Sequence, residues 1–365
     1  MKKLLFFLNV PWKWIKQRPH FIAEILAEDY SVTVIDKFSY MSNNLISNPA
    51  SSRLDFRKEY RLPFDSNPAV HVINQSLARI QMSRQLNQHD VFWFCGPLEF
   101  GTYGRCIDPG KTVVYDCMDD MQNMPLSHAV GEEAARSEAK LVERADLLFC
   151  SSENLATKIQ ARFGRGDCMV VNNAMHIVPN GNLPVAIMKR AIELRSNGIK
   201  IIAYVGTIDK WFDFEAIIES LSRDQSCAYL LAGPVRVAIP HHDRIFYTGV
   251  IKHSEVFSFL ALADILVLPF ILNELILGVN PVKLYEYIFA CKPCVVRRYA
   301  ETERFEQFVY LYSTVDEFCS TLTLLAEQQY PLKLAPAEYE KFAHRNTWET
   351  RARQVRGVLA GHSLL

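Results

Sequence analysis

The chain of 365 residues has only 15 glycines, and none stands where two common nucleotide-binding loops need them. The first apolar run, Leu4–Leu8, leads into Asn9-Val10-Pro11-Trp12, and no glycine occurs before Gly96. A G-x-G-x-x-G turn after the first strand is therefore missing, and so is a G-x-x-x-x-G-K-[ST] loop anywhere in the chain. These absences argue against NAD and ATP as ligands of the N-terminal half.

The chain also lacks a net charge and a long apolar run. Its 40 Lys and Arg balance 40 Asp and Glu, which is not the basic composition of a protein that binds nucleic acid. No window reaches the ~18 apolar residues of a membrane span. The apolar N-terminus is too short for a signal peptide and runs into Pro-Trp-Lys-Trp instead of a small-residue cleavage site. We therefore expect a cytoplasmic protein with no nucleic-acid partner.

Cysteine occurs nine times, an odd number, and mostly inside apolar runs. This usage is typical of reduced thiols in the cytoplasm. Cys291 and Cys294 form a CxxC pair, but no second pair completes a zinc site. We interpret both thiols as packing residues and expect no metal site.

Short apolar runs alternate with stretches of helical spacing along the whole chain. Such alternation implies crossover connections and a parallel sheet covered by helices on both faces. In the first half the expected strands are Leu4–Leu8, Val32–Ile35, Val70–Ile73, Val91–Cys95, Thr112–Tyr115, Leu147–Cys150 and Met169–Val171, and the expected helices are Pro19–Ala27, Gln75–Gln88, Glu132–Arg144 and Glu153–Phe163. In the second half the expected strands are Ile199–Val205, Tyr229–Ala232, Ile245–Tyr247, Ile265–Pro269 and Cys294–Arg297, and the expected helices are Phe214–Ser222, Ser254–Ala263 and a short one around Lys283.

The predicted architecture has two α/β domains. The polar segment His176–Pro184 carries Pro and Gly, and a helical stretch and a new strand follow it. We therefore place an N-terminal domain at 1–184, a second domain at 185–345 and a final helical segment at 346–365, which Asn346 or Thr347 can cap. Spacing alone leaves open whether this last helix packs on its own domain or on the first one.

In the second domain, glycines follow three predicted strands, at Gly206-Thr207, Gly233 and Gly249. Ligands of open α/β sheets bind beyond the carboxyl ends of strands, where glycine lets the backbone come close. The alternative is that each glycine only makes a tight turn.

The stretch Asn280–Val296, NPVKLYEYIFACKPCVV, carries the most specific signal. Lys283 and Glu286 are three residues apart near the start of a short helix, so they share one helical face. There an ammonium can reach a diphosphate, and a carboxylate can accept hydrogen bonds from ribose hydroxyls. The alternative is an ordinary amphipathic helix with two solvated charges.

At these residues the chain resembles GT-B glycosyltransferases, close to bacterial enzymes that build teichuronic acids and other surface polysaccharides. The segment YVGTIDKWFDFEAI, Tyr204–Ile217, also resembles the start of that family's donor domain. The resemblance implies two Rossmann-like domains that face each other across a cleft, with a C-terminal helix that crosses back to the first. It implies a nucleotide-sugar donor linked to UDP, and no metal at the diphosphate.

Carried over residue by residue, the resemblance makes Lys283 the phosphate partner and Glu286 the ribose partner. It places Gly206, Thr207, Gly233 and Asn280 in the donor site as well. One departure matters, because many retaining relatives have two glutamates seven residues apart, and counting back from Glu286 reaches Gly278. Glu274 lies too close to the preceding strand to replace it, so the sugar-contacting acid and the retaining or inverting outcome stay open.

The acceptor side is expected in the N-terminal domain, in the loop Trp12–His20, whose Gln-Arg-Pro-His ending resembles the same branch of the family. Pro19 fits a helix start, and Trp12, Arg18 and His20 would then face the acceptor. His20 either touches substrate or caps the helix.

The loop after the strand at Tyr115 carries Asp116, Asp119 and Asp120. Inverting transfer to a sugar hydroxyl needs a carboxylate that accepts the proton, and clustered carboxylates raise one another's pKa. We favour Asp119 as the base, then Asp120, and expect Asp116 to brace the loop by accepting from backbone N–H groups. The alternative is an acidic turn in which Asp caps a helix.

A basic face is expected on the helix that holds Arg79 and Arg84, beside apolar Leu77, Ile80 and Met82. Such a face either contacts an anionic inner leaflet, where a lipid-linked acceptor resides, or packs on the sheet. The sequence therefore predicts a glycosyltransferase for a saccharide or lipid-linked acceptor. A nucleotide-sugar epimerase of the same architecture and a catalytically silent GT-B subunit are the alternatives.

Overall fold

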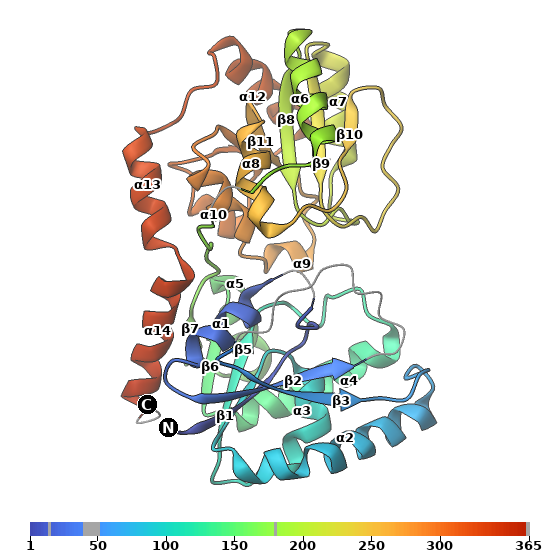
Figure 1. Ribbon diagram of the computed structural model, residues 1–365, viewed down its shortest axis with the longest axis vertical. Helices are drawn as coiled ribbons and strands as arrows, with labels where there is room; N and C mark the ends of the chain where they lie inside the picture. Colours follow the sequence, from blue (N-terminus) through green and yellow to red (C-terminus); the bar gives the residue numbers. More distant parts are fainter. Residues whose placement is uncertain (14–15, 39–51, 179–180, 363–365) are drawn as a thin grey trace. The chain divides into compact units, whose positions relative to one another are not determined.

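A computed structural model describes residues 1–13, 16–38, 52–178 and 181–362. Contacts divide the chain into two compact units. Unit 1 comprises Met1–Asn172 and Trp348–Leu365, and unit 2 comprises Asn173–Thr347. Each unit holds one parallel sheet with helices on its faces (Figure 1).

The sheet of unit 1 has seven strands in the order β3-β2-β1-β4-β5-β6-β7, and every neighbouring pair is parallel. Its central strands are continuous apolar runs because helices cover both faces. The strands are β1 (Lys3–Phe7), β2 (Ser31–Phe38), β3 (Asp55–Tyr60), β4 (Val91–Phe94), β5 (Thr112–Cys117), β6 (Leu147–Cys150) and β7 (Met169–Val170). The helices are α1 (Arg18–Leu26), α2 (Pro68–Gln88), α3 (Pro97–Tyr103), the 3-10 turn η1 (Gly104–Cys106), α4 (His128–Arg144), α5 (Glu153–Phe163) and α14 (Trp348–Gly361).

One predicted strand is wrong. Val70–Ile73 lies inside helix α2, which begins where the Asn67 side chain accepts from two backbone N–H groups and Pro68 takes the first helical position. The strand of this region is β3, which sequence reasoning missed because only one of its residues, Glu59, is fully buried. An edge strand of charged residues gives little apolar signal.

Unit 2 holds a six-stranded parallel sheet in the order β10-β9-β8-β11-β12-β13. Its strands are β8 (Lys200–Val205), β9 (Cys227–Ala232), β10 (Ile245–Tyr247), β11 (Ile265–Leu268), β12 (Cys294–Arg297) and β13 (Tyr310–Tyr312). Its helices are α6 (Val185–Ser196), α7 (Phe214–Arg223), the 3-10 turn η2 (His253–Glu255), α8 (Val256–Ala261), α9 (Glu274–Leu277), α10 (Val282–Phe289), α11 (Ala300–Glu303), α12 (Val315–Glu327) and α13 (Pro336–Arg345).

Both sheets reverse their strand order once. The reversal lies between β1 and β4 in unit 1 and between β8 and β11 in unit 2. Ligands of such sheets bind outside the carboxyl ends of the strands at this point. The predicted fold class, two Rossmann-like α/β domains, is confirmed.

The segment 173–184, which the sequence-based division gave to the first domain, belongs by its contacts to unit 2. Gly181 N–H donates to Ser254 O over 2.7 Å, and Ser258 Oγ donates to Gly181 O over 2.7 Å. A Cβ at Gly181 would come within 2.8 Å of Ser254 O, so only glycine permits this approach. The two ends of unit 2 also meet, in a parallel bridge between Met175 and Thr347.

Helix α14 belongs to unit 1 although it ends the described chain. The Trp348 ring stacks on Phe21 of α1 with 4.9 Å between ring centroids, and Arg356 pairs with Glu28 and Asp29 just beyond α1. The expectation from the family resemblance, that the last helix packs on the first domain, is confirmed. Residues 363–365 of the predicted segment lie outside the described part.

Candidate active site

Three predicted donor-site residues lie together at the carboxyl edge of the unit 2 sheet. Gly233 has φ +127°, and a Cβ there would meet Gly206 O at 2.1 Å. The turns after β8 and β9 therefore pack backbone to backbone, which only glycine allows. Tyr204 Oη donates to Thr207 O over 2.9 Å and fixes the turn after β8. The result is a backbone-lined edge of the kind that accepts a phosphate-bearing ligand.

Helix α10 is anchored at that same edge. Val205 N–H, which ends β8, donates to Tyr287 Oη over 3.0 Å. Glu286, one residue earlier, has a side chain that is only 3% exposed, and it accepts from Lys283 Nζ over 2.8 Å. The predicted cation and acid therefore contact each other on one face of α10, beside the Gly206 turn.

The charge on Glu286 is set by two opposing effects. Burial raises the pKa of Glu286, but the Lys283 ammonium and His253 outweigh burial and hold that pKa below its usual value. The carboxylate is therefore ionised at neutral pH and available to accept hydrogen bonds.

His253 is a member of this cluster that sequence reasoning missed. Its Nε2 lies 3.7 Å from Glu286 Oε1, whereas Lys283 contacts Oε2. Its ring faces the His176 ring with 6.4 Å between centroids. His253 belongs to η2, which is 33 residues before Glu286 in the chain, so helical spacing gave no signal.

Asn280 is buried, and both ends of its side chain are engaged within unit 2. Its Oδ1 accepts from Asn173 N–H over 3.1 Å and from Tyr285 Oη over 3.0 Å, and its Nδ2 donates to Glu301 over 3.0 Å. These contacts hold the approach to α10 in place. Since Oδ1 already accepts two hydrogen bonds, a direct contact of Asn280 with a donor, as predicted, would use the second N–H of Nδ2.

In unit 1, Arg18 does not lie open to an acceptor as predicted. It is 2% exposed, and its guanidinium donates to Asp116 over 2.7 to 3.1 Å and to Val171 O. The expectation that Asp116 accepts from backbone N–H groups is likewise corrected, because its carboxylate pairs with Arg18. The sequence placed Arg18 on the acceptor side and predicted that Asp116 braces a loop. In the structure the two form one buried ion pair between α1 and β5.

Arg18→Ala is expected to lower the free energy of unfolding by roughly 3 kcal/mol, because it leaves the Asp116 carboxylate buried without a counter-charge. Urea unfolding followed by circular dichroism measures the change. Arg57→Ala, at an arginine whose side chain is 50% exposed and pairs with Asp55, is the control and should change the free energy by less than ~1 kcal/mol. An equal, small loss in both variants would contradict a structural role for Arg18.

Asp120 is held by two cations of helix α5. Lys158 Nζ donates to it over 2.8 Å, Arg162 over 2.9 and 3.1 Å, and Asn123 Nδ2 over 2.8 Å. Burial raises the pKa of Asp120, but the hydrogen bonds from Arg162 and Lys158 outweigh it and lower that pKa to about 2. Such a carboxylate is a weak base. The geometry therefore favours a structural role for Asp120, which the sequence analysis named as the second choice for the base.

Asp119 differs from both neighbours. Within the described residues its half-buried carboxylate makes no ion pair or hydrogen bond, whereas its backbone O accepts from Cys117 Sγ at 3.7 Å. Burial raises the pKa of Asp119 to about 6, with Arg18 opposing the shift and Asp120 adding to it. Asp119 is thus the carboxylate of this region that can act as a base. The aspartates before and after it, Asp116 and Asp120, are held by cations.

The other two N-terminal candidates are packed inside unit 1. His20 is 0% exposed, its Nδ1 accepts from Gln17 N–H over 3.1 Å, and its Nε2 lies 3.3 Å from Pro11 O. Of the two predicted roles the structure shows the helix cap, and burial lowers the pKa of His20. Trp12 is 4% exposed and packs between the rings of His20 and Phe56. The predicted loop also contains residues 14–15, which lie outside the described part.

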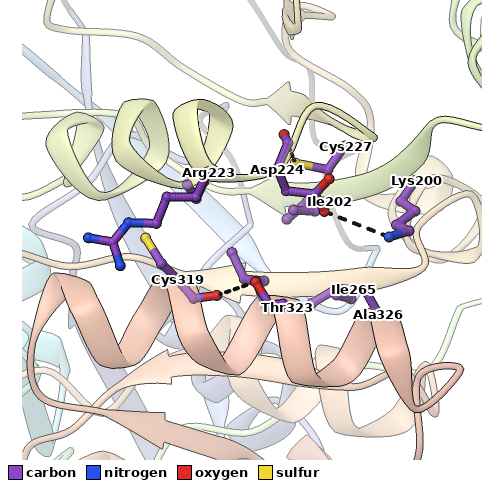
Figure 2. Close-up of a pocket in the computed structure, with 11 residues that line it drawn as sticks. Lys200, Ile202, Arg223, Asp224, Cys227, Ile265, Cys319, Thr323 and Ala326 are labelled. Atoms are coloured by element: carbon purple, nitrogen blue, oxygen red, sulfur yellow. Dashed lines mark hydrogen bonds and ion pairs between the residues drawn. The ribbon is translucent and has the colours of Figure 1, made fainter.

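A crevice between α7 and α12 lies at the opposite, amino-terminal edge of the unit 2 sheet (Figure 2). Arg223, at the end of α7, faces Cys319 and Thr323 of α12 across it. The crevice has a volume of about 10 Å³, which holds roughly one water molecule. This crevice therefore is no donor site. Within the described ranges, no group of three or more His, Cys, Asp or Glu side chains is placed to hold a metal ion.

No protein-family model matches the chain. A Bacillus subtilis (strain 168) protein named "Putative teichuronic acid biosynthesis glycosyltransferase TuaH" is 24% identical over 220 residues, which are 55% of this chain and 54% of that protein. The chain thus matches about half the length of this curated relative.

Solved structures match over nearly the whole chain. Sucrose-phosphate synthase from Thermosynechococcus elongatus has a TM-score of 0.74 at 12% identity, over 99% of both chains. Anabaena HepE in complex with UDP-glucose has a TM-score of 0.69 at 14% identity, over 99% of this chain and 100% of that one. An alpha,alpha-trehalose-phosphate synthase (UDP-forming) from Burkholderia vietnamiensis has 0.66 at 11% identity, over 99% and 100%.

At these identities the likeness shows the fold. The resemblance seen in the sequence is confirmed: the chain has the GT-B fold of these glycosyltransferases, with one Rossmann-like sheet in each unit.

Proposed function

We propose that this protein is a glycosyltransferase that takes a sugar from a UDP-sugar and transfers it to a saccharide or lipid-linked acceptor of a bacterial surface polysaccharide. The observation that carries the proposal is the Lys283–Glu286 pair on α10, with 2.8 Å between Nζ and Oε2. The pair lies beside the glycine-lined edge of unit 2, in the fold of proteins solved with UDP and UDP-glucose.

In the donor complex, Lys283 binds the diphosphate as a cation at the start of α10. The buried Glu286 carboxylate accepts hydrogen bonds from the ribose hydroxyls, which strengthens binding because the acceptor is charged. Gly206 and Gly233 pack the two turns backbone to backbone. The backbone of these turns, Thr207 included, lines the edge that the ligand approaches. Protein groups alone neutralise the leaving diphosphate, and we propose that no metal is needed.

Asp119 is the proposed base for the acceptor hydroxyl. Asp116 of β5 and Asp120 of the following loop are each paired with cations, while burial raises the pKa of Asp119 to about 6. A base with a pKa near the working pH is the most effective one.

The function is tested by thermal shift against a panel of nucleotide sugars, with hydrolysis and transfer monitored by mass spectrometry. A rise in Tm with a UDP-sugar, and a product that forms only with an added saccharide, would support the proposal. Conversion of the nucleotide sugar without an acceptor would instead favour the epimerase. No shift with any nucleotide sugar would favour the silent subunit and contradict the proposal.

A membrane-facing surface on α2 is part of the proposal. No helix of the described segments is long and apolar enough to cross a bilayer. Val72, Ile73 and Ile80 of α2 are 63%, 49% and 71% exposed, and Arg84 is exposed one turn after Ile80. Apolar side chains flanked by a cation suit an anionic lipid surface. Arg79, predicted on the same face, instead donates to Thr102 O over 2.7 Å and points inward.

Ile80→Asp is expected to reduce binding to anionic vesicles several-fold in a co-sedimentation assay, because it removes an apolar side chain and adds a negative charge. Val185→Asp changes an apolar residue of unit 2 that is 69% exposed, and it should leave vesicle binding unchanged. Equal vesicle binding by the Ile80 variant and the wild type would contradict the proposed membrane surface. It would not affect the proposed glycosyltransferase activity.

A further inference from the structure

We infer that His253 is a positioning residue of the donor site: it holds the Glu286 carboxylate when the Lys283 ammonium turns to a nucleotide diphosphate. The inference rests on the proposed function, because it assumes that Lys283 binds a diphosphate. The inference adds His253 to the predicted pair of Lys283 and Glu286. His253 does not contact the donor but holds the Glu286 carboxylate.

The free protein shows why a third residue is needed. The Lys283 ammonium lies 2.8 Å from Glu286 Oε2, so the cation that should bind phosphate is already bound to the acid that should bind ribose. The Lys283 side chain is 27% exposed and can swing toward a ligand, whereas Glu286 is 3% exposed and fixed on the inner face of α10. Diphosphate binding therefore separates the pair and leaves the carboxylate behind.

A buried carboxylate that loses its ammonium partner is strongly destabilised, because water does not solvate it. His253 is placed to prevent this. Its Nε2 is 3.7 Å from Oε1, the oxygen that Lys283 does not contact. This distance is slightly too long for a hydrogen bond, so a small movement of the His253 side chain, which is 27% exposed, makes one as Lys283 departs. The two oxygens of Glu286 thus have separate partners, one that leaves and one that stays.

The position of His253 is supported from its other side. The His176 ring lies against it at an interplanar angle of 26°. The chain that carries His176 is bound to the η2–α8 segment through Gly181, whose N–H donates to Ser254 O and whose O accepts from Ser258 Oγ. Both histidines therefore belong to one braced surface of unit 2, and His253 keeps its orientation toward Glu286.

The test compares UDP with uridine in the full-length protein. His253→Phe keeps a ring against His176 but removes the N–H donor. We expect its affinity for UDP to fall about tenfold, the effect of losing one charge-assisted hydrogen bond. Its affinity for uridine should stay within about twofold, because uridine has no diphosphate to draw Lys283 away. Calorimetry measures UDP, and competition with a labelled UDP measures uridine.

His253→Gln is the matched variant, because its side-chain amide can still donate to Oε1. It should bind UDP within about threefold of the wild type, and both variants should melt as the wild type does. Tighter binding of UDP by the glutamine than by the phenylalanine variant identifies the N–H as the group that matters. Equal losses in the two variants would overturn the inference.

Two further results would overturn it in distinguishable ways. Wild-type affinity for UDP in His253→Phe, together with a loss in Lys283→Ala, would sink the role of His253 but keep the donor site. An equal loss of affinity for UDP and for uridine in His253→Phe would show that the substitution distorts the whole site. The loss would then not come from a missing hydrogen bond to Glu286. Absence of UDP binding by the wild type would remove this inference and the proposed donor together.

Discussion

Asp119→Asn is expected to reduce sugar transfer by about 10²- to 10⁴-fold, the usual contribution of a general base. The affinity for UDP should not change, because the proposed donor contacts are all in unit 2, whereas Asp119 is in unit 1. Initial rates at saturating donor measure the first quantity, and calorimetry measures the second. Asp108→Asn, at an exposed aspartate of the same unit, is the control and should keep full activity.

The pH dependence of the wild type supplies an independent check. Burial raises the pKa of Asp119 to about 6, and only the ionised form accepts a proton. The transfer rate should therefore fall as the pH drops below 6, with one protonation responsible. A rate that stays flat down to pH 5 would point to another base, as would full activity in the asparagine variant.

The same pKa has a consequence for stability. A carboxyl whose pKa is higher in the folded than in the unfolded protein binds more protons when folded, so the wild type loses stability as pH rises from about 4 to about 6. The asparagine variant escapes this loss. It should melt at a higher temperature than the wild type at pH 7.5, and the difference should shrink at pH 5. Asp120→Asn should do the opposite at pH 7.5, because it frees Lys158 and Arg162 from a buried partner.

Lys283→Ala is expected to weaken UDP binding by about 10- to 100-fold, which corresponds to a charge-assisted contact worth roughly 1.5 to 3 kcal/mol. The main effect is that the diphosphate loses its cation. This loss outweighs an opposite effect, because binding no longer has to separate Lys283 from Glu286. Calorimetry with UDP measures the loss.

Lys341→Ala is the matched control for this variant. Lys341 pairs with Glu338 at the same i, i+3 spacing and 2.6 Å, but on helix α13, where both side chains are exposed. Its replacement should leave UDP affinity unchanged. If Lys283→Ala binds UDP as the wild type does, the donor assignment to α10 is lost, and with it the proposed function.

How much of this site the sequence revealed depends on how far apart the partners are in the chain. Lys283 and Glu286 were found because helical geometry links residues three positions apart. The Arg18–Asp116 pair joins residues 98 positions apart, and no local pattern signals it. The same limit hid Lys158 and Arg162 as the partners of Asp120, so the sequence ranked Asp120 as the second candidate base although the structure pairs it with two cations.

The fold was more predictable than the site. Buried parallel strands are continuous apolar runs, and most were found within one or two residues, including β6, β10 and β12. The edge strand β3 failed because its outward residues are charged, and the exposed valine and isoleucine of α2 imitated a strand. A pattern of apolar residues indicates burial, and these two errors occur where burial does not follow secondary structure. Strand β13 and helices α12 and α13 were not predicted either.

The bridge between Met175 and Thr347 brings the two ends of unit 2 together. Asn173–Thr347 is one uninterrupted stretch, so its excision leaves two neighbouring termini and cuts no strand of either sheet. A gene fragment for this stretch alone should therefore yield a self-contained module for structural work on the nucleotide half. A short linker from Asn172 to Trp348 would close the remainder into a second module.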